Sequence, residues 1–221
     1  MVDLMGDMTP PHLPFARRSL ATAPARTHRV RACAWAAVAL VLLIALAGCV
    51  RQRPPGVLAA DNPVQEAPDA RPFAFKGFAV TPLARFHVTA RVLHTCDYHM
   101  GRESRLSPRD LALGWGPMSD SAVLADLHID QMERFYTWSA HDLPIEQDDI
   151  VSHSSNMHII PADDTVRAAL MRVETGDVVT IDGELVQVNA DDGWAWASSM
   201  SRDDTGDGAC ELLFARSLDV K

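Results

Sequence analysis

The chain has 221 residues, 48% of them hydrophobic and 22% charged, and its formal net charge is −9 at pH 7. The first 48 residues contain five of the 20 basic and two of the 29 acidic side chains, which leaves 15 and 27 in the rest and a net charge of −12 there. Such an acidic surface repels phosphate backbones, so we expect no nucleic-acid partner.

The N-terminal part has a basic segment followed by an apolar one. Five arginines between positions 17 and 31 precede the apolar run 34–47. A helix that spans the hydrocarbon core needs about 20 residues, and this run is shorter. The pattern therefore predicts a cleaved signal peptide over 1–48, and an uncleaved anchor is the alternative.

The apolar run ends in Leu46-Ala47-Gly48-Cys49, which resembles the lipobox of bacterial lipoproteins. The resemblance implies a diacylglycerol thioether and an acylated amine on Cys49, a lipid anchor in the membrane. Each buried methylene of such chains contributes roughly 0.8 kcal/mol, so several acyl chains anchor stably. Val50 in place of aspartate implies, by analogy with enterobacterial sorting, the outer membrane with the domain facing the periplasm. An ordinary signal peptide with an accidental Ala-Gly-Cys is the other interpretation.

Residues 49–71 contain a proline every few positions and no apolar periodicity. A segment of this kind cannot bury enough surface to offset its chain entropy. We therefore expect a flexible Pro-rich tether over 49–71, followed by a single domain over 72–221, a length that suits one hydrophobic core.

Hydrophobic periodicity predicts both strands and helices in the first part of this domain. Ser107 and Pro108 suit the N-cap and first position of a short helical turn. The expected elements are a strand over 86–94, that turn, a helix over 119–127, a strand over 134–139, an extended or irregular segment over 150–160, and a helix over 161–173.

The last part of the chain predicts antiparallel pairing. Asp182-Gly183 lies between two short apolar runs in 177–189, and Asp-Gly is a typical hairpin dipeptide. Two more strands are expected, over 194–200 and 210–218. The fold class is therefore α+β, with a mainly antiparallel sheet or a small OB- or SH3-like barrel and two or three short helices.

Two cysteines, Cys96 and Cys210, fall inside the predicted domain, because Cys33 lies in the signal and Cys49 is the lipid site. In an oxidising compartment they can form one disulfide, which would contribute about 2–4 kcal/mol. We expect that bridge, with two separate thiols as the alternative.

Three further patterns are candidate sites. His94, Cys96 and His99 are residue types that zinc accepts, although no second ligand pair accompanies them, so we expect neither a metal nor a cofactor. His153, Asn156 and His158 lie near serines and suggest a Ser/His nucleophile, but no Gly-x-Ser-x-Gly elbow is present. The Asp-rich segment 202–208 resembles a calcium loop loosely, and a solvated loop is the simpler interpretation.

The tryptophans bear on where a binding surface could lie. Trp115, between two glycines, is expected to be buried as a cover on the core. Trp194 and Trp196 are two residues apart in a predicted strand and therefore share one of its faces.

Three segments, Leu106–Asp120, Ser152–Ala162 and Ser198–Glu211, together resemble uncharacterised exported bacterial proteins. The resemblance implies one domain and no particular chemistry. The sequence thus predicts an envelope lipoprotein with a non-enzymatic binding or structural domain, whose partner is an envelope protein or polymer. The alternative is a metal-dependent or Ser/His hydrolase acting in the periplasm.

Overall fold

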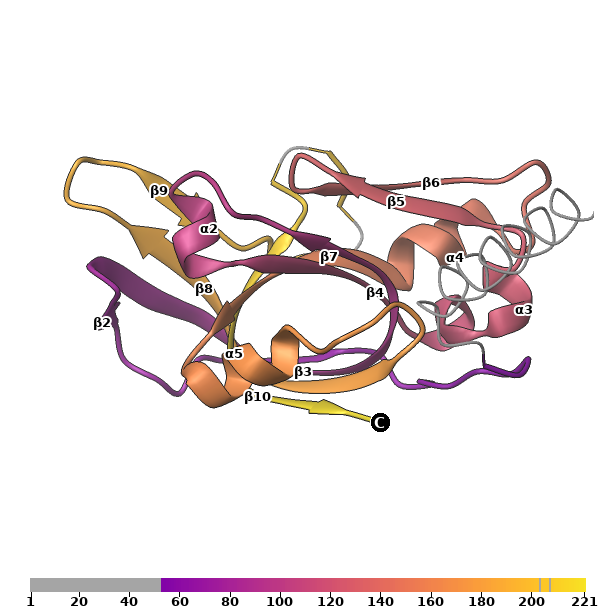
Figure 1. Ribbon diagram of the computed structural model, residues 1–221, viewed down its shortest axis with the longest axis horizontal. Coiled ribbons are helices and arrows are strands. Elements are labelled where there is room, and N and C mark those ends of the chain that lie inside the picture. The colour runs from indigo at the N-terminus through magenta and orange to yellow at the C-terminus, as the bar shows by residue number, and fades with distance from the viewer. Residues whose placement is uncertain (1–52, 203, 207) are drawn as a thin grey trace, which may run out of the picture. The chain divides into compact units, whose positions relative to one another are not determined.

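The computed structural model describes residues 53–202, 204–206 and 208–221 (Figure 1). The predicted signal peptide over 1–48, the lipidation site Cys49 and the first tether residues lie outside this range. Within it, no helix has the length and apolar character that a membrane span needs.

Strands dominate the described residues. They are β1 (Val64–Glu66), β2 (Phe73–Phe75), β3 (Phe78–Asp97), β4 (Arg109–Gly114), β5 (His128–Met132), β6 (Phe135–Ser139), β7 (Ser154–Pro161), β8 (Val178–Asn189), β9 (Ala195–Ala197) and β10 (Glu211–Val220). Between them lie short helices: α2 (Glu103–Leu106), the 3-10 turn η1 (Gly116–Ser119), α3 (Ser121–Leu124), α4 (Gln147–Ser152) and α5 (Asp164–Leu170). The predicted α+β class with a mainly antiparallel sheet is confirmed.

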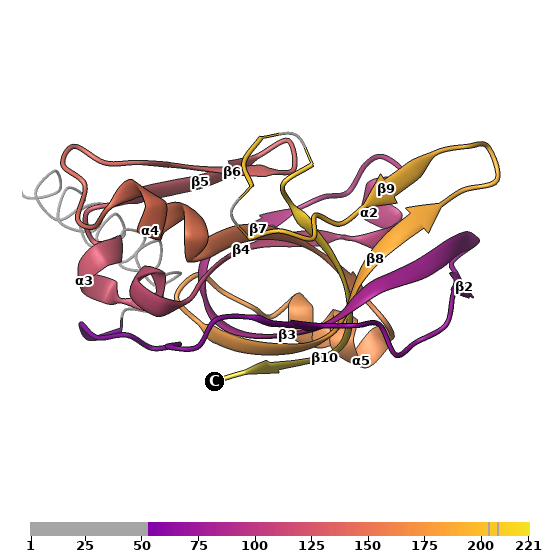
Figure 2. The same cartoon turned by 180° about the vertical axis from the view of Figure 1, so that it is seen from behind.

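Five strands close into a ring. Their order is β3-β4-β7-β10-β8, and β8 pairs back onto β3. The β7–β10 pair is parallel and the other pairs are antiparallel, with α5 in the connection between β7 and β8. This five-stranded arrangement is that of an OB-like barrel. It is not an isolated barrel, because β1, β2 and β9 continue the sheet beyond the ring. Figure 2 shows β2 and β9 extending from it.

The ring is filled by apolar side chains. Alternate residues of β3 point inward, among them Phe86, Val88 and Val92, and pack against residues of β4, β7, β8, β10 and α5. Trp115 belongs to the same core and is 1% exposed, so its predicted burial is confirmed. The opening visible inside the ring in Figure 1 is therefore occupied by side chains.

The strand β3 contributes side chains to three cores, and its two register shifts separate these contributions. One lies between Pro82 and Ala84 and the other between Val92 and His94. Each shift inserts one extra residue and so exchanges the faces of the strand. Residues before the first shift, such as Val80, pack in a second core with Leu212 and Phe214.

The predicted hairpin at Asp182-Gly183 is wrong, because β8 runs through these residues without a break. Gly183 is needed there for close approach of the neighbouring strand. A Cβ atom at this position would lie 2.1 Å from the carbonyl oxygen of Phe214 on β10. The glycine thus marks a tight strand contact, the second common role of glycine in a strand.

Two other predictions of local structure are also wrong. Ser107 does not cap a helix; the segment after Pro108 is strand β4, and Ser107 ends α2. The predicted tether 49–71 does not remain separate from the domain where it is described. Ala59 is buried, its amide and that of Leu58 donate to Ser119 Oγ, and Val64–Glu66 pairs with β3. The domain therefore begins before residue 72.

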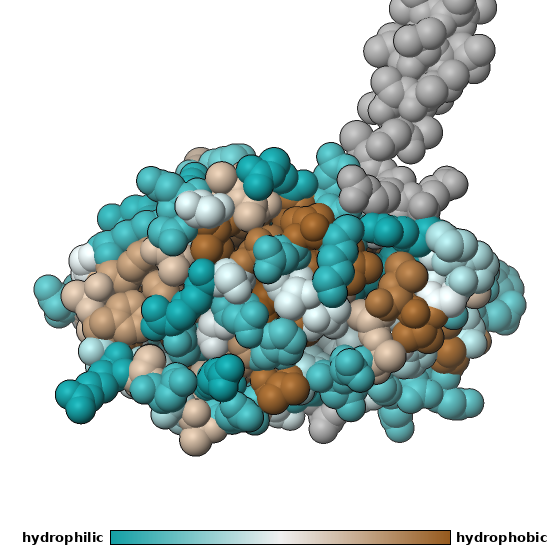
Figure 3. All heavy atoms as spheres, turned by 90° about the horizontal axis from the view of Figure 1, so that it is seen from below, coloured by the Kyte–Doolittle hydropathy of each residue, from teal (hydrophilic) through white to brown (hydrophobic). Residues whose placement is uncertain are grey.

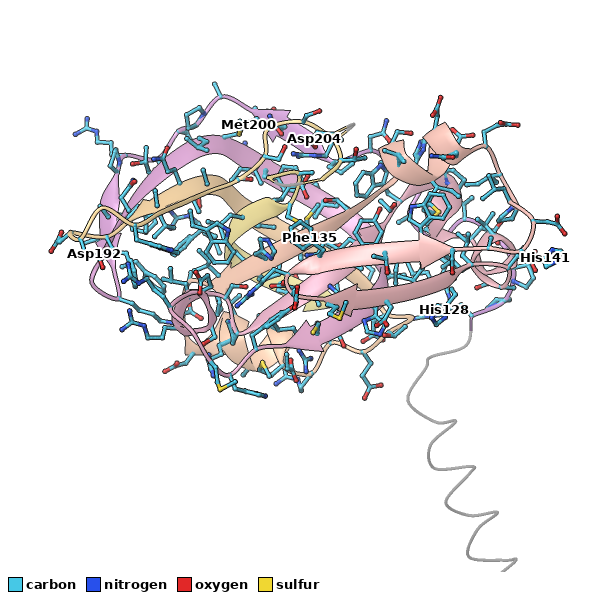
Figure 4. All side chains as sticks on the ribbon, turned by 90° about the horizontal axis from the view of Figure 1, so that it is seen from above. His128, Phe135, His141, Asp192, Met200 and Asp204 are labelled. Carbon is cyan, nitrogen blue, oxygen red and sulfur yellow. The ribbon has the colours of Figure 1, made fainter. Side chains whose placement is uncertain are left out.

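The hairpin β5–β6 forms a sheet of its own and lies across the barrel. Figure 4 looks down on it, with Phe135 at its turn end and His141 beyond its other end. Its Ile129, Tyr136 and Trp138 pack on Leu93, Ala112 and other residues of a third core. Because Ala112 belongs to β4, the hairpin covers the outer side of the barrel there. The opposite side of the domain is mainly hydrophilic, with separate small apolar areas (Figure 3).

Candidate ligand-binding site

A cleft of about 310 Å³ lies between the hairpin and the barrel. Strand β6, the end of α4, the beginning of β7 and the loop before β10 form its walls. The lining side chains include the aromatic groups Phe135, Tyr136 and Trp138 and the polar groups Ser154, Ser155, Asn156, Arg202, Asp204, Thr205 and Glu211. This volume is at the lower end of the range for small-molecule sites, and an apolar wall with a few polar groups is their usual lining.

The floor of the cleft is a buried carboxyl group. Ser155 and Glu211 are on the inward faces of β7 and β10, two residues before core residues on those strands. The Ser155 hydroxyl donates to Glu211 Oε2, and Arg202 Nε lies 2.6 Å from Glu211 Oε1. The Glu211 side chain is only 1% exposed. The end of the barrel interior thus presents a carboxyl group to the cleft.

Burial determines the protonation of this carboxyl group. It raises the pKa of Glu211 to about 7, although Arg202 and the Ser155 hydrogen bond act in the opposite direction. Burial also raises the pKa of Cys210 to about 11 and raises that of Tyr136. Ionisable groups with shifted pKa values gather at functional sites more often than elsewhere, so this cleft is the first candidate for one.

The raised pKa of Glu211 makes stability depend on pH. In the unfolded chain the pKa is close to 4.5, so between pH 4.5 and 7 the folded protein binds more protons than the unfolded chain. The free energy of unfolding should therefore fall as the pH rises through this window, by at most about 3 kcal/mol. Urea denaturation at pH 5 and pH 8 measures this change, and Glu211→Gln should reduce it. Equal pH dependence in both proteins would contradict the assignment.

Next to the cleft, a second polar cluster lies beneath the turn of the hairpin. Asp110 on β4 has no exposed side-chain surface, and its Oδ1 accepts from Arg134 Nη1 at 2.7 Å. His158 on β7 places Nδ1 2.9 Å from Asp110 Oδ2, an ion-pair distance without hydrogen-bond alignment. The ring of Trp196 lies 4.9 Å from the imidazole ring. This cluster joins β4, β7 and the hairpin.

The predicted Ser/His set does not converge. Asn156 and His158 share the outer face of β7, where Asn156 donates to the Arg134 carbonyl oxygen at 2.8 Å. His153 lies at the end of α4, where its Nδ1 is 2.9 Å from the Asp149 carbonyl oxygen and 3.1 Å from Ser152 Oγ. The Ser152 hydroxyl itself donates to the Asp148 carbonyl oxygen. The two histidines therefore have separate partners, and His158 is occupied by Asp110.

The three candidate metal ligands, His94, Cys96 and His99, also do not form a site. His94 donates from Nδ1 to Gln131 Oε1 at 3.0 Å, whereas His99 follows the end of β3 and is exposed. Among the described residues, no three His, Cys, Asp or Glu side chains are arranged to hold a metal ion. The loop 202–208, which was compared with a calcium loop, instead forms a wall of the cleft through Arg202, Asp204 and Thr205.

The predicted disulfide between Cys96 and Cys210 is not formed, and both thiols are free. Cys96 is on β3, while Cys210 lies against Asn156 of β7, with β4 between these strands. Two strand spacings amount to roughly 10 Å. Disulfide-linked Cα atoms lie within about 7 Å, so the two residues are too far apart.

Sequence reasoning missed the groups that matter most here. Asp110 and Arg134 were placed in elements but not selected, and Glu211 was counted only as part of a strand. The alternation of β10 gave one signal, because it puts Glu211 on the same face as the core residues Leu213 and Ala215. An acidic residue on the buried face of a strand is unusual and marks a candidate site.

A scan against protein-family models, a search of curated proteins and a search of solved structures find no significant match. What the domain does therefore has to be inferred from the geometry of its own residues.

Proposed function

We propose that the protein is a lipid-anchored envelope protein whose domain binds another envelope component, a polymer or a protein, in the cleft beneath β6. The cleft carries this proposal, because it combines aromatic side chains with convergent polar groups. Aromatic rings provide apolar contact area, and the exposed residues Asp204 and Thr205 provide hydrogen-bonding groups. These are the features of a site for a polar ligand with an apolar face.

The charged groups of the cleft support binding rather than catalysis. Glu211 is held by Arg202 and Ser155, and the Tyr136 hydroxyl lies 2.8 Å from Ser154 Oγ. Ser154 in turn donates to the Ile150 carbonyl oxygen. Ser154, Ser155 and Tyr136 thus already have protein partners, and within the described part of the chain none of these three is hydrogen-bonded to a histidine base of the kind that activates a serine.

Photo-crosslinking in intact cells tests the binding proposal. Benzoylphenylalanine at Thr137, an exposed residue that lines the cleft, should give a reproducible crosslinked species. The same group at Ala168, an exposed residue of α5, serves as the control. Arg202→Ala should weaken the crosslink from Thr137. Identical products from both positions, or none from Thr137, would contradict the proposed site.

The lipid anchor gives a separate prediction. Cys49→Ala should abolish incorporation of an alkyne-labelled fatty acid and release the protein from the membrane fraction, because the acyl chains supply the membrane affinity. Cys33→Ala, which changes the leader but not the lipobox, should keep both properties. Fatty-acid labelling of the Cys49→Ala protein would show that the anchor lies elsewhere.

The second candidate is a periplasmic hydrolase, favoured by one observation: Asp110 Oδ2 lies 2.9 Å from Nδ1 of the buried His158, the spacing of acid and base in a catalytic triad but without its hydrogen-bond alignment. Asp110 and His158 would then be the orienting acid and the base. Purified protein should hydrolyse p-nitrophenyl esters, and His158→Ala should abolish that activity while Thr137→Ala preserves it. The absence of turnover by the purified wild-type protein would eliminate this candidate for esters.

A further inference from the structure

The guanidinium group of Arg134 occupies a notch built from acidic, hydroxyl and aromatic groups. Nη1 lies 2.7 Å from Asp110 Oδ1 and 3.4 Å from Ser107 Oγ, and Nη2 donates to the Ser107 carbonyl oxygen at 3.1 Å. The Tyr98 ring centroid is 3.8 Å from Cζ of Arg134, and that of Trp196 is 5.4 Å from it. Asp110 and Ser107 are fully buried. The notch therefore binds a planar cation in two ways: oxygen atoms accept hydrogen bonds from the edge of the cation, and aromatic rings lie against its faces.

The segment that supplies Arg134 is strained. Glu133 and Arg134 form the two-residue turn between β5 and β6, with φ of +52° and +73°. Turns of this kind strongly prefer asparagine and glycine, because other residues are disfavoured at positive φ. The contacts of Arg134 in the notch offset this strain. Once those contacts are lost, leaving the turn conformation lowers the free energy of the backbone.

The hairpin is attached to the barrel in a way that permits movement. It pairs only within itself, as a separate two-stranded sheet, among the residues described. The hydrogen bonds that reach the barrel from the turn region use side chains, such as Gln131 to Asn156 and the Arg134 amide to the Tyr98 hydroxyl. Displacing the turn therefore breaks no sheet ladder with the barrel.

An open cavity of about 450 Å³ lies directly outside the notch. Trp194 and Trp196, whose ring centroids are 6.2 Å apart, form part of its lining, as do Glu103 and Glu133. Neither glutamate forms an ion pair within the part of the chain that the structure describes. The mouth of the notch is thus aromatic and acidic, which suits an approaching basic segment.

We propose that this notch is a receptor site for an arginine side chain of a partner protein, and that Arg134 fills it in cis when the partner is absent. The partner's arginine replaces Arg134 against Asp110, Tyr98 and Trp196, and a neighbouring cation of the partner meets Glu103 and Glu133. Residues 49–221 carry a net charge of −12, which attracts such a basic segment. The site is distinct from the cleft beneath β6.

A tethered side chain competes strongly with a free one, because its effective concentration reaches the millimolar range or more. Removing it should therefore expose the binding capacity of the notch. Arg134→Gly deletes the side chain and also relieves the positive φ. The substitution leaves Ile129, Tyr136 and Trp138, the side chains through which the hairpin packs on the barrel, in place. Arg102→Ala is the matched control, since Arg102 also lies over a tryptophan ring, Trp194, but on the surface with Asp192.

The first experiment is chemical rescue of the chain that lacks its leader. Millimolar N-ethylguanidinium should raise the Tm of Arg134→Gly by several degrees relative to equal concentrations of sodium or ethylammonium. Wild type, Arg102→Ala and the double variant Arg134→Gly with Asp110→Asn should show no such difference. Equal Tm values for Arg134→Gly in the three salts would overturn the proposal.

The second experiment uses a tryptophan-free Lys-Arg-Lys peptide, with fluorescence of Trp194 and Trp196 as the signal. Arg134→Gly should bind it at least about tenfold more tightly than wild type does. The same peptide with citrulline in place of arginine should lose that gain. Equal affinities of wild type and Arg134→Gly, or of the two peptides, would overturn the partner assignment. If Arg134→Gly does not fold, Arg134→Ala is used with the same expectations.

Discussion

Replacing Gly183 with alanine is expected to destabilise the domain by about 3 kcal/mol or more, the upper range for overpacking. The added Cβ would lie 2.1 Å from the Phe214 carbonyl oxygen and 3.0 Å from its carbon, both backbone atoms of β10. To relieve this overlap, β8 and β10 would have to move apart at the Gly183–Ala215 pairing, which belongs to the closed ring of strands. Urea denaturation of the wild-type and variant domains measures the difference.

Gly193→Ala is the control for this prediction. Gly193 lies in the turn between β8 and β9 with φ of +88°, and nothing lies within 4 Å of a Cβ placed there. Its replacement should cost about 1–2 kcal/mol of backbone strain. A loss at Gly183 no larger than that at Gly193 would mean that the two strands can separate easily.

Gly183 also shows what the sequence could not decide. An Asp-Gly pair between short apolar runs fits a hairpin turn as well as a close strand contact. The choice depends on which strand lies alongside, and β10 is about 30 residues further along the chain. Local pattern thus predicted the sheet and its antiparallel character but misplaced the turn.

A similar reason explains the error at β4. Ser107 and Pro108 carry a helix-start signal, yet the next residues pair with β3 and β7 on both sides. Burial on both faces overrides local preference, because a central strand gains packing along its whole length. The alternation of apolar and polar residues along β3, and likewise along β6, is simpler to interpret, because one face of each strand is more exposed than the other.

The candidate site shows the largest gap between sequence and structure. Asp110, Arg134 and His158 come from three elements and meet only because β4 and β7 are neighbours and the hairpin folds over them. The cleft residues Tyr136, Ser155 and Glu211 are equally dispersed. The predicted motifs were contiguous runs, and contiguous residues on a strand point to opposite faces.

Asp110→Asn should destabilise the domain by about 3–5 kcal/mol, because it leaves the guanidinium of Arg134 and the imidazole of His158 without their buried partner. The two ends of the pair are 0% and 17% exposed, so water replaces the lost interaction poorly. Glu66→Gln, which breaks the exposed pair with Arg85, should cost less than about 1 kcal/mol. Denaturation of both variants provides the comparison.

The same substitution should also loosen the hairpin, since Arg134 ties its turn to β4. Phe135, Tyr136 and Trp138 follow that turn and form one wall of the cleft, so its shape depends on the Asp110 contact. Hydrogen exchange of the β5–β6 amides should therefore accelerate in Asp110→Asn more than exchange of the β3–β8 amides. If exchange accelerates equally at the β5–β6 and the β3–β8 amides, Asp110 stabilises the barrel as a whole. The hairpin would then not open independently of the barrel, and its opening could not control ligand access to the cleft.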